Sequence, residues 1–85
     1  MPYITKDRRA IVDPEITVLV EKLRQLGLGD VVYVLYRLLK KLYGDTRNFY
    51  TKAQALAVLE STRAEYYRRV LAPYEDEKIE QNGDI

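Results

Sequence analysis

The chain has 85 residues and a net charge of +1, and it contains no cysteine and no histidine. This composition excludes disulfides, thiolate zinc sites and histidine-based acid–base catalysis. The length predicts a single helical domain over residues 1–85, and a domain of this size has a thin stability margin. No apolar run approaches the ~18 residues of a membrane span, and no signal-peptide pattern opens the chain, so we expect a soluble, cytoplasmic protein.

The first half of the chain predicts a helix at about residues 14–26. Asp13-Pro14-Glu15 has the residue types of a helix start, with an N-cap aspartate, proline at the first position and acid in the first turn. Apolar residues follow at steps of three and four, and Gly27 predicts the end. A short turn capped by Thr5 is expected before this helix, over residues 6–12.

A second helix is predicted at about residues 30–43, with Asp30 as its N-cap and Gly44 as its stop. This helix is apolar nearly all round. A helix without a polar face lies at the centre of its domain or is covered by a partner. We therefore expect Leu35 and Leu38 to be core residues.

The third and longest helix is predicted at about residues 52–71, where Thr51 and Gln54 have the spacing of a capping box. Pro73 has no N–H, which predicts a kink or tight break, with Ala72 pushed out of the helical backbone region. A short C-terminal helix at about residues 73–81 follows and ends at Gly83. These elements predict an all-α fold, a small helical bundle of three main helices and one short helix.

The C-terminal part also carries a recognisable signature. It consists of Glu65-Tyr66-Tyr67-Arg68-Arg69-Val70, Ala72-Pro73-Tyr74-Glu75-Asp76, Lys78-Ile79 and Asn82-Gly83-Asp84-Ile85, with further blocks at Met1-Pro2-Tyr3-Ile4 and Gly29-Asp30…Tyr33-Val34. The signature resembles that of a family of short uncharacterised proteins from bacterial and phage genomes. The resemblance spans nearly the whole chain and implies a small helical protein with no established activity, so no catalytic residue is carried over.

Self-association is the function that the sequence favours most. The central helix and the long helix together carry more apolar surface than a soluble monomer exposes. A symmetric pair covers such surface, so we expect a homo-oligomer, most simply a dimer, through the helices at 31–43 and 52–71. This interpretation describes an interaction or structural protein without catalytic activity, cofactor or metal site.

A cluster of charged and aromatic residues is expected around Pro73, formed by Glu65, Arg68, Arg69, Tyr74 and Glu75. Glu65 and Arg69 are four residues apart, which places them on one helix face. The carbonyl of Arg69 loses its usual donor because Pro73 has no N–H, and a guanidinium has donors for both a carbonyl and a carboxylate. The cluster is either structural or a ligand site.

Nucleic-acid binding is the first alternative function. Arg63, Arg68 and Arg69 alternate with Tyr66 and Tyr67, which combines phosphate donors with rings on which bases can stack. Lys40 and Lys41 would extend this patch. The acidic residues that follow Pro73, and the intrahelical pairing expected for Glu65, argue against a dedicated binder.

The second alternative is a magnesium-dependent nucleotide pyrophosphohydrolase. Helical enzymes of that class hold Mg²⁺ with a Glu-x-x-Glu pair on one helix and a second acidic pair on the next. Glu77 and Glu80 have the first spacing. The sequence has no second pair of that kind, so a solvated acidic face is the simpler interpretation.

Overall fold

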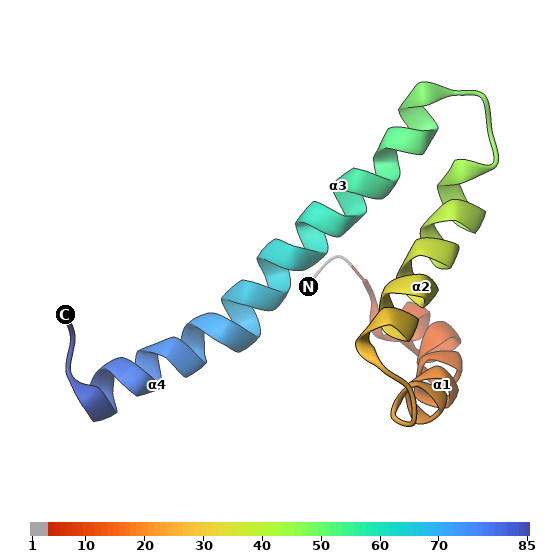
Figure 1. Cartoon of the computed structure of the whole chain (residues 1–85). Helices are drawn as coiled ribbons and strands as arrows, with labels where there is room; N and C mark the ends of the chain where they lie inside the picture. The colour runs from red at the N-terminus through yellow and green to blue at the C-terminus, as the bar shows by residue number, and fades with distance from the viewer. Residues whose placement is uncertain (1–3) are drawn as a thin grey trace. The chain divides into compact units, whose positions relative to one another are not determined.

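The computed structural model describes residues 4–85, and every regular element in this range is helical (Figure 1). The predicted all-α class is confirmed. The signature block at Met1-Pro2-Tyr3, which we expected to be extended, lies outside the described residues. The chain divides into two units, Met1–Asp45 and Thr46–Ile85, and the expectation of one domain stays a prediction. No helix within residues 4–85 is long and apolar enough to cross a membrane.

Helix α1 (Lys6–Leu23) begins eight residues before the predicted start. Thr5 is its N-cap, with the hydroxyl accepting from the N–H of Arg8 at 3.4 Å. The helix passes through Pro14 and does not begin there. Pro14 removes only one backbone donor, and the Thr5 cap already stabilises the turns before it. The residue types around Asp13 therefore resemble a helix start, but the cap at Thr5 begins the helix earlier.

Helix α2 (Leu28–Leu39) continues directly into a π-helical turn, η1 (Lys40–Gly44). Gly27 is the N-cap, and Asp30, the third helical residue, accepts from the Gly27 N–H at 2.9 Å. Asp30 therefore reaches back to the start of the helix and is not the N-cap that the sequence predicted. The helical stretch ends at Gly44, as expected.

Helix α3 (Phe49–Tyr66) opens the C-terminal unit. Its N-cap is Asn48, whose side-chain oxygen accepts from the N–H of Thr51 at 3.2 Å. The N–H of Asn48 donates in turn to the Thr46 hydroxyl at 3.2 Å, which fixes the approach of the chain. The predicted capping box at Thr51 and Gln54 is wrong, because Asn48 lies three residues earlier and is the stronger N-cap residue type.

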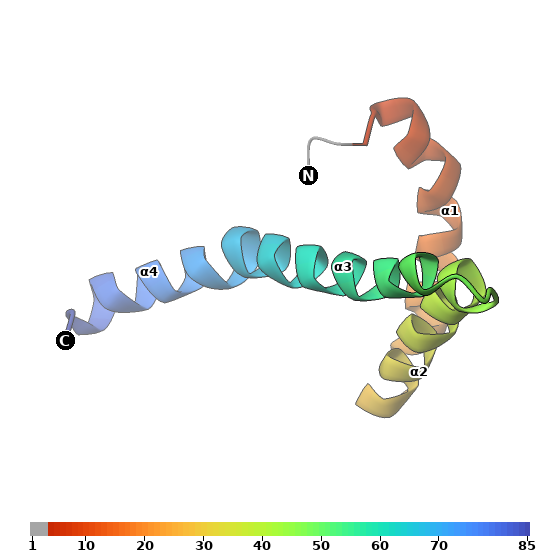
Figure 2. The same cartoon turned by 90° about the horizontal axis from the view of Figure 1, so that it is seen from above.

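A second π-turn, η2 (Tyr67–Leu71), joins α3 to α4 (Ala72–Asn82) without an interruption. Ala72 has φ −60° and ψ −44°, so it stays helical despite preceding a proline, and the expected departure from the helical region is wrong. Figures 1 and 2 show from two sides that α3 and α4 follow one another as one rod. The rod ends at Gly83, whose φ of 82° suits glycine.

Neither unit has a buried side chain among the residues that the structure describes. Leu35 is 48% exposed and Leu38 is 47% exposed, so the expectation that they form a core within the chain is wrong. Helical periodicity identifies the apolar side of a helix but not what covers that side. In the C-terminal unit the reason is plain, because a single continuous helix has no other element of its own unit to pack against.

Replacing Asn48 with alanine tests the observed start of α3. We expect Asn48→Ala to lower the free energy of unfolding by about 1 kcal/mol, because the first turn loses its side-chain acceptor. Thr51→Ala is the matched control at the position that the sequence indicated, and it should leave stability nearly unchanged. Urea unfolding followed by circular dichroism measures both; a larger loss for Thr51→Ala would contradict the assignment.

Candidate functional site

The π-turn before Pro73 is the most unusual backbone feature of the C-terminal unit. Pro73 cannot donate a hydrogen bond, so an α-helical ladder has a gap at this point. In η2 the N–H of Ala72 donates to the carbonyl of Tyr67, five residues earlier in place of four. The turn thereby holds one residue more than an α-helical turn, and such turns occur often at functional sites. The side chains around it are the candidate site.

Glu65 binds two guanidinium groups on the N-terminal side of the π-turn. One carboxylate oxygen accepts from Nε of Arg69 at 3.2 Å and also from Nη2 of Arg68. The side chain of Glu65 is only 15% exposed, whereas those of Arg68 and Arg69 are 65% and 56% exposed. The hydrogen bond from Arg68, with the nearby positive charges, lowers the pKa of Glu65 below its ordinary value.

Tyr67 and Glu75 form a second contact, which spans the π-turn and Pro73. The pKa of the Tyr67 phenol is raised above its ordinary value, first by a side-chain hydrogen bond to the Glu75 carboxylate and next by the negative charge of that carboxylate. Residues eight apart lie about 80° from each other around an α-helix. The extra residue of the π-turn reduces this to about 20°, as for residues seven apart. The π-turn therefore aligns the two side chains.

The five residues of the expected cluster are distributed over three separate contacts. Glu65 joins Arg68 and Arg69, Glu75 contacts Tyr67, and the Tyr74 ring lies 5.5 Å from the ammonium nitrogen of Lys78. Sequence spacing indicated the first contact, since three- and four-residue steps are neighbours on any helix. It missed Tyr67 and Lys78 as partners. The signal for Tyr67 was a proline inside an otherwise helical pattern, which favours an extra residue in the turn before it.

The residues proposed for nucleic acid are exposed and belong to both units. Arg63, Tyr66 and Tyr67 lie at the end of α3 and the start of η2, with Tyr66 58% exposed. Lys40 and Lys41 belong to η1 of the N-terminal unit. Glu65 already engages Arg68 and Arg69, two of the three arginines on the C-terminal rod, and Arg63 is the third.

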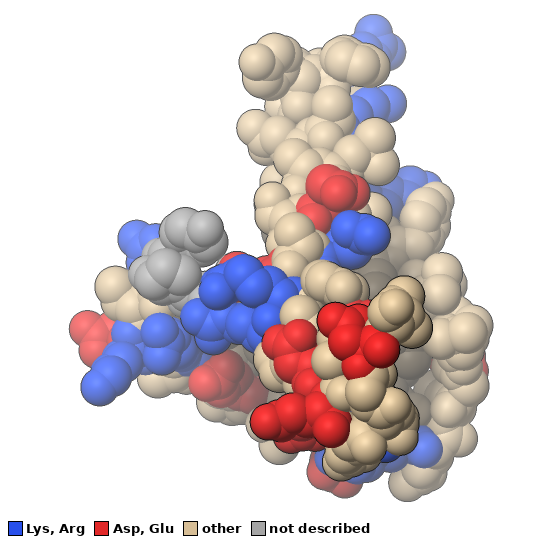
Figure 3. Space-filling view, turned by 90° about the vertical axis from the view of Figure 1, so that its left-hand side faces the viewer, with Lys and Arg blue, Asp and Glu red and all other residues tan. Residues whose placement is uncertain are grey.

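The acidic residues of the second alternative lie on α4, which includes Glu77 and Glu80. Figure 3 shows Asp and Glu side chains gathered on the side of the molecule where α4 ends. Within residues 4–85, no three or more acidic side chains come together in an arrangement that could hold a metal ion. Glu77 and Glu80 are both exposed on α4, and the simpler interpretation of a solvated acidic face stays a prediction.

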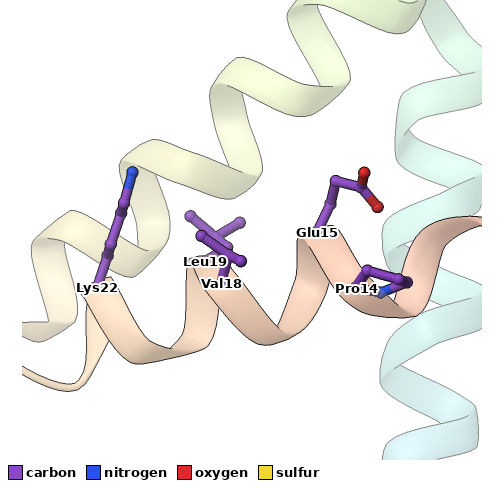
Figure 4. Close-up of a pocket in the computed structure, with 5 residues that line it drawn as sticks. All are labelled: Pro14, Glu15, Val18, Leu19 and Lys22. Atoms are coloured by element: carbon purple, nitrogen blue, oxygen red, sulfur yellow. The ribbon is translucent and has the colours of Figure 1, made fainter.

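A shallow hollow of about 270 Å³ lies on α1 of the N-terminal unit. It is lined by Pro14, Glu15, Val18, Leu19 and Lys22, all from that one helix. Figure 4 shows the side chains of Glu15, Leu19 and Lys22 leaving α1 on the same side. The lining is mainly apolar with one charge of each sign near its ends, and it has no set of convergent polar groups that would orient a small ligand.

Comparison with known proteins gives a family but no activity. The model of a family described as Domain of unknown function (DUF6899) matches residues 1–85. The curated proteins and the solved structures contain no match to the chain. The family description is consistent with the resemblance to uncharacterised proteins, and it assigns no reaction, ligand or partner to any of the residues described above.

The contact across the π-turn predicts how Tyr67 titrates. Its raised pKa means that the neutral, donating phenol is favoured in the folded chain. The stabilisation is therefore complete below about pH 10, the unfolded value, and is lost as the pH rises through the folded pKa. We expect Glu75→Gln to bring the pKa of Tyr67 down toward its ordinary value, because the acceptor loses its charge.

NMR of the tyrosine ring carbons measures this titration, with the Tyr67 signal assigned by Tyr67→Phe. Glu80→Gln is the matched control: it removes the same charge from the same helix at a position without a contact to Tyr67. A Tyr67 titration that is unchanged by Glu75→Gln would show that the hydrogen bond across the π-turn does not form.

Proposed function

We propose that this chain, which belongs to the DUF6899 family, is a small helical protein that acts by binding a second copy of itself. One observation carries the proposal: among residues 4–85 no side chain is buried, while large apolar side chains are exposed along both units. A soluble chain covers such continuous apolar surface with a partner. A second copy offers the same surfaces, and a two-fold arrangement brings each of them against itself.

The surfaces in question are the two that the sequence indicated, at residues 31–43 and 52–71. On α2 and the following π-turn, Leu35, Leu38 and Leu42 are 48%, 47% and 67% exposed. On α3, Leu56 and Leu59 are 69% and 42% exposed. Burying a leucine contributes about 1.5–3 kcal/mol relative to leaving it in water. Burial of several such residues from each copy favours association and opposes the entropy cost of bringing two chains together.

The polar groups around the π-turn support a structural role for the signature. Glu65 is shared by two arginines, Glu75 is bonded to Tyr67, and Lys78 lies over Tyr74. Each contact joins residues of the same rod, and the contact of Tyr67 with Glu75 spans Pro73. A catalytic site would bring a nucleophile, a base and an oxyanion donor toward one point. The contacts therefore favour an interaction protein, while the expected lack of a cofactor and the bacterial or phage setting stay predictions.

Binding of single-stranded nucleic acid is the second candidate, favoured by one observation. Arg63 and Tyr66 are exposed neighbours, three residues apart on α3, and could offer a phosphate donor beside a stacking ring. Against it, Glu65 engages both Arg68 and Arg69, and α4 is acidic. We rank this candidate below self-association.

Solution mass tests the proposed self-association. At micromolar concentration, sedimentation equilibrium should give a multiple of the 10.0 kDa monomer mass, most simply twice that value. Leu59→Glu places a charge on the exposed apolar side of α3 and should weaken association by about tenfold or more. Gln54→Glu is the matched control, since it adds the same charge on the opposite side of the same helix.

A stable monomer at these concentrations would overturn the proposal. A monomer that binds a labelled oligonucleotide in fluorescence anisotropy, and loses this binding in Arg63→Ala, would establish the second candidate in its place.

A further inference from the structure

We infer that two copies pair in antiparallel orientation along the C-terminal rod, with each apolar seam facing that of the partner across the π-turn. The apolar seam is defined as Leu56, Leu59, Tyr66, Leu71 and Tyr74. This inference rests on the proposed self-association and adds to it the surface, the partner orientation and the register. It uses only the C-terminal unit, Thr46–Ile85.

The seam is continuous only because of the π-turn. Leu56, Leu59 and Tyr66 follow one another at steps of three and seven, so they share one side of α3. In an unbroken α-helix Leu71 would lie about 120° from Leu59, twelve residues earlier, and Tyr74 about 80° from Tyr66, eight residues earlier. The extra residue in η2 changes both angles by about 100°, so that each pair lies within about 20°. The contact between Tyr67 and Glu75 supports this alignment, because those two residues share a side of the rod only when the π-turn holds one extra residue.

All five seam residues are available to a partner. Their exposed fractions are 69% for Leu56, 42% for Leu59, 58% for Tyr66, 45% for Leu71 and 56% for Tyr74. Leu59 and Tyr66 are seven residues apart, as in a two-helix interface. Tyr66 and Tyr74 are eight residues apart because the π-turn adds one residue. Nothing within the C-terminal unit covers it, because that unit is one continuous rod.

Charge determines the orientation of the two rods. Residues 49–71 carry Lys52, Arg63, Arg68 and Arg69 against Glu60 and Glu65, a net charge of +2. Helix α4 carries Glu75, Asp76, Glu77 and Glu80 against Lys78, a net charge of −3. A parallel pair would place the two acidic helices side by side, where like charges repel. An antiparallel pair separates the two acidic helices and places each α4 against residues 48–58 of its partner, which carry Lys52 and no acid.

The apolar residues also select a register. With the two-fold axis near residues 64–65, Leu56 lies opposite the partner's Tyr74, and Leu59 lies opposite the partner's Leu71. In the same register Arg63 approaches the ring of the partner's Tyr66, where a guanidinium can stack. Sliding the rods by one heptad toward the C-terminus would place Leu59 opposite the partner's Lys78, which exchanges an apolar contact for a charged one.

Spin labels on single cysteines test the orientation, because the chain has no cysteine of its own. Thr62→Cys places a label near the axis and Gln81→Cys places one near the end of α4. In the inferred pair the two labels at position 62 lie within about 25 Å, and those at position 81 are separated by about 45–50 Å, from the helical rise of 1.5 Å per residue. Pulsed dipolar spectroscopy on the full chain measures both distances.

Each outcome of the label experiment has one meaning. A short distance at position 62 with a long one at position 81 supports the antiparallel pair. Short distances at both positions indicate parallel rods and overturn the inference while leaving self-association intact. Long distances at both positions in a confirmed dimer indicate pairing through another surface. They also overturn the inference and leave self-association intact. A monomer by mass overturns self-association itself and, with it, the inferred antiparallel pair.

A charge reversal gives a second readout whose sign differs between the two orientations. Glu77→Lys replaces an acid that lies near the partner's Lys52 in the antiparallel pair, so the dimer dissociation constant should rise about twofold to fivefold at low salt. In a parallel pair the same change relieves repulsion and lowers that constant. Asp84→Lys is the matched control beyond the end of the rod and should leave it unchanged. A tighter Glu77→Lys dimer overturns the inference.

Discussion

The backbone donor that is missing at Pro73 determines the geometry of the C-terminal unit. A proline in a helix interior usually kinks or ends the helix, because one carbonyl loses its partner and the ring clashes with the preceding turn. Here the hydrogen bond from Ala72 to Tyr67 widens the turn, and the helix continues on the far side. The widened turn changes which side chains share a side of the rod. One extra residue in the widened turn has two results. It places Glu75 beside Tyr67, and it returns Leu71 to the side of Leu59.

The two units share a second property, which is that their apolar side chains face outward. In the C-terminal unit this is a necessary result of having a single rod. In the N-terminal unit, α1 and α2 each keep apolar side chains in solvent, and Val18 and Val32 are 57% and 58% exposed. The ion pair of Arg24 with Glu21 in the N-terminal unit lies in solvent and contributes little to stability. The main source of further stability is therefore apolar contact beyond each unit.

Sequence reasoning identified the fold class and the number of long helices but misplaced several starts. Helix starts depend on competition between nearby cap residues, and Thr5 and Asn48 prevailed over Asp13 and Thr51 because they satisfy the first turn from further upstream. The contacts of Glu65 were predictable because they are local to any α-helix. The contact of Tyr67 with Glu75 was not, since its eight-residue spacing has meaning only once the turn has changed. Burial was not predictable, because a pattern of apolar residues does not say what lies against it.

The absence of a buried side chain among residues 4–85 has a consequence for how the protein exists in a cell. A helix with a solvated backbone and no packed side is stabilised weakly and opens readily along its length. If folding is completed only when copies meet, the folded fraction depends on how much protein has been made, and newly made chains pass through a period of exposure to proteases. Synthesis level would then set both the amount of assembled protein and the lifetime of each chain before it finds a partner.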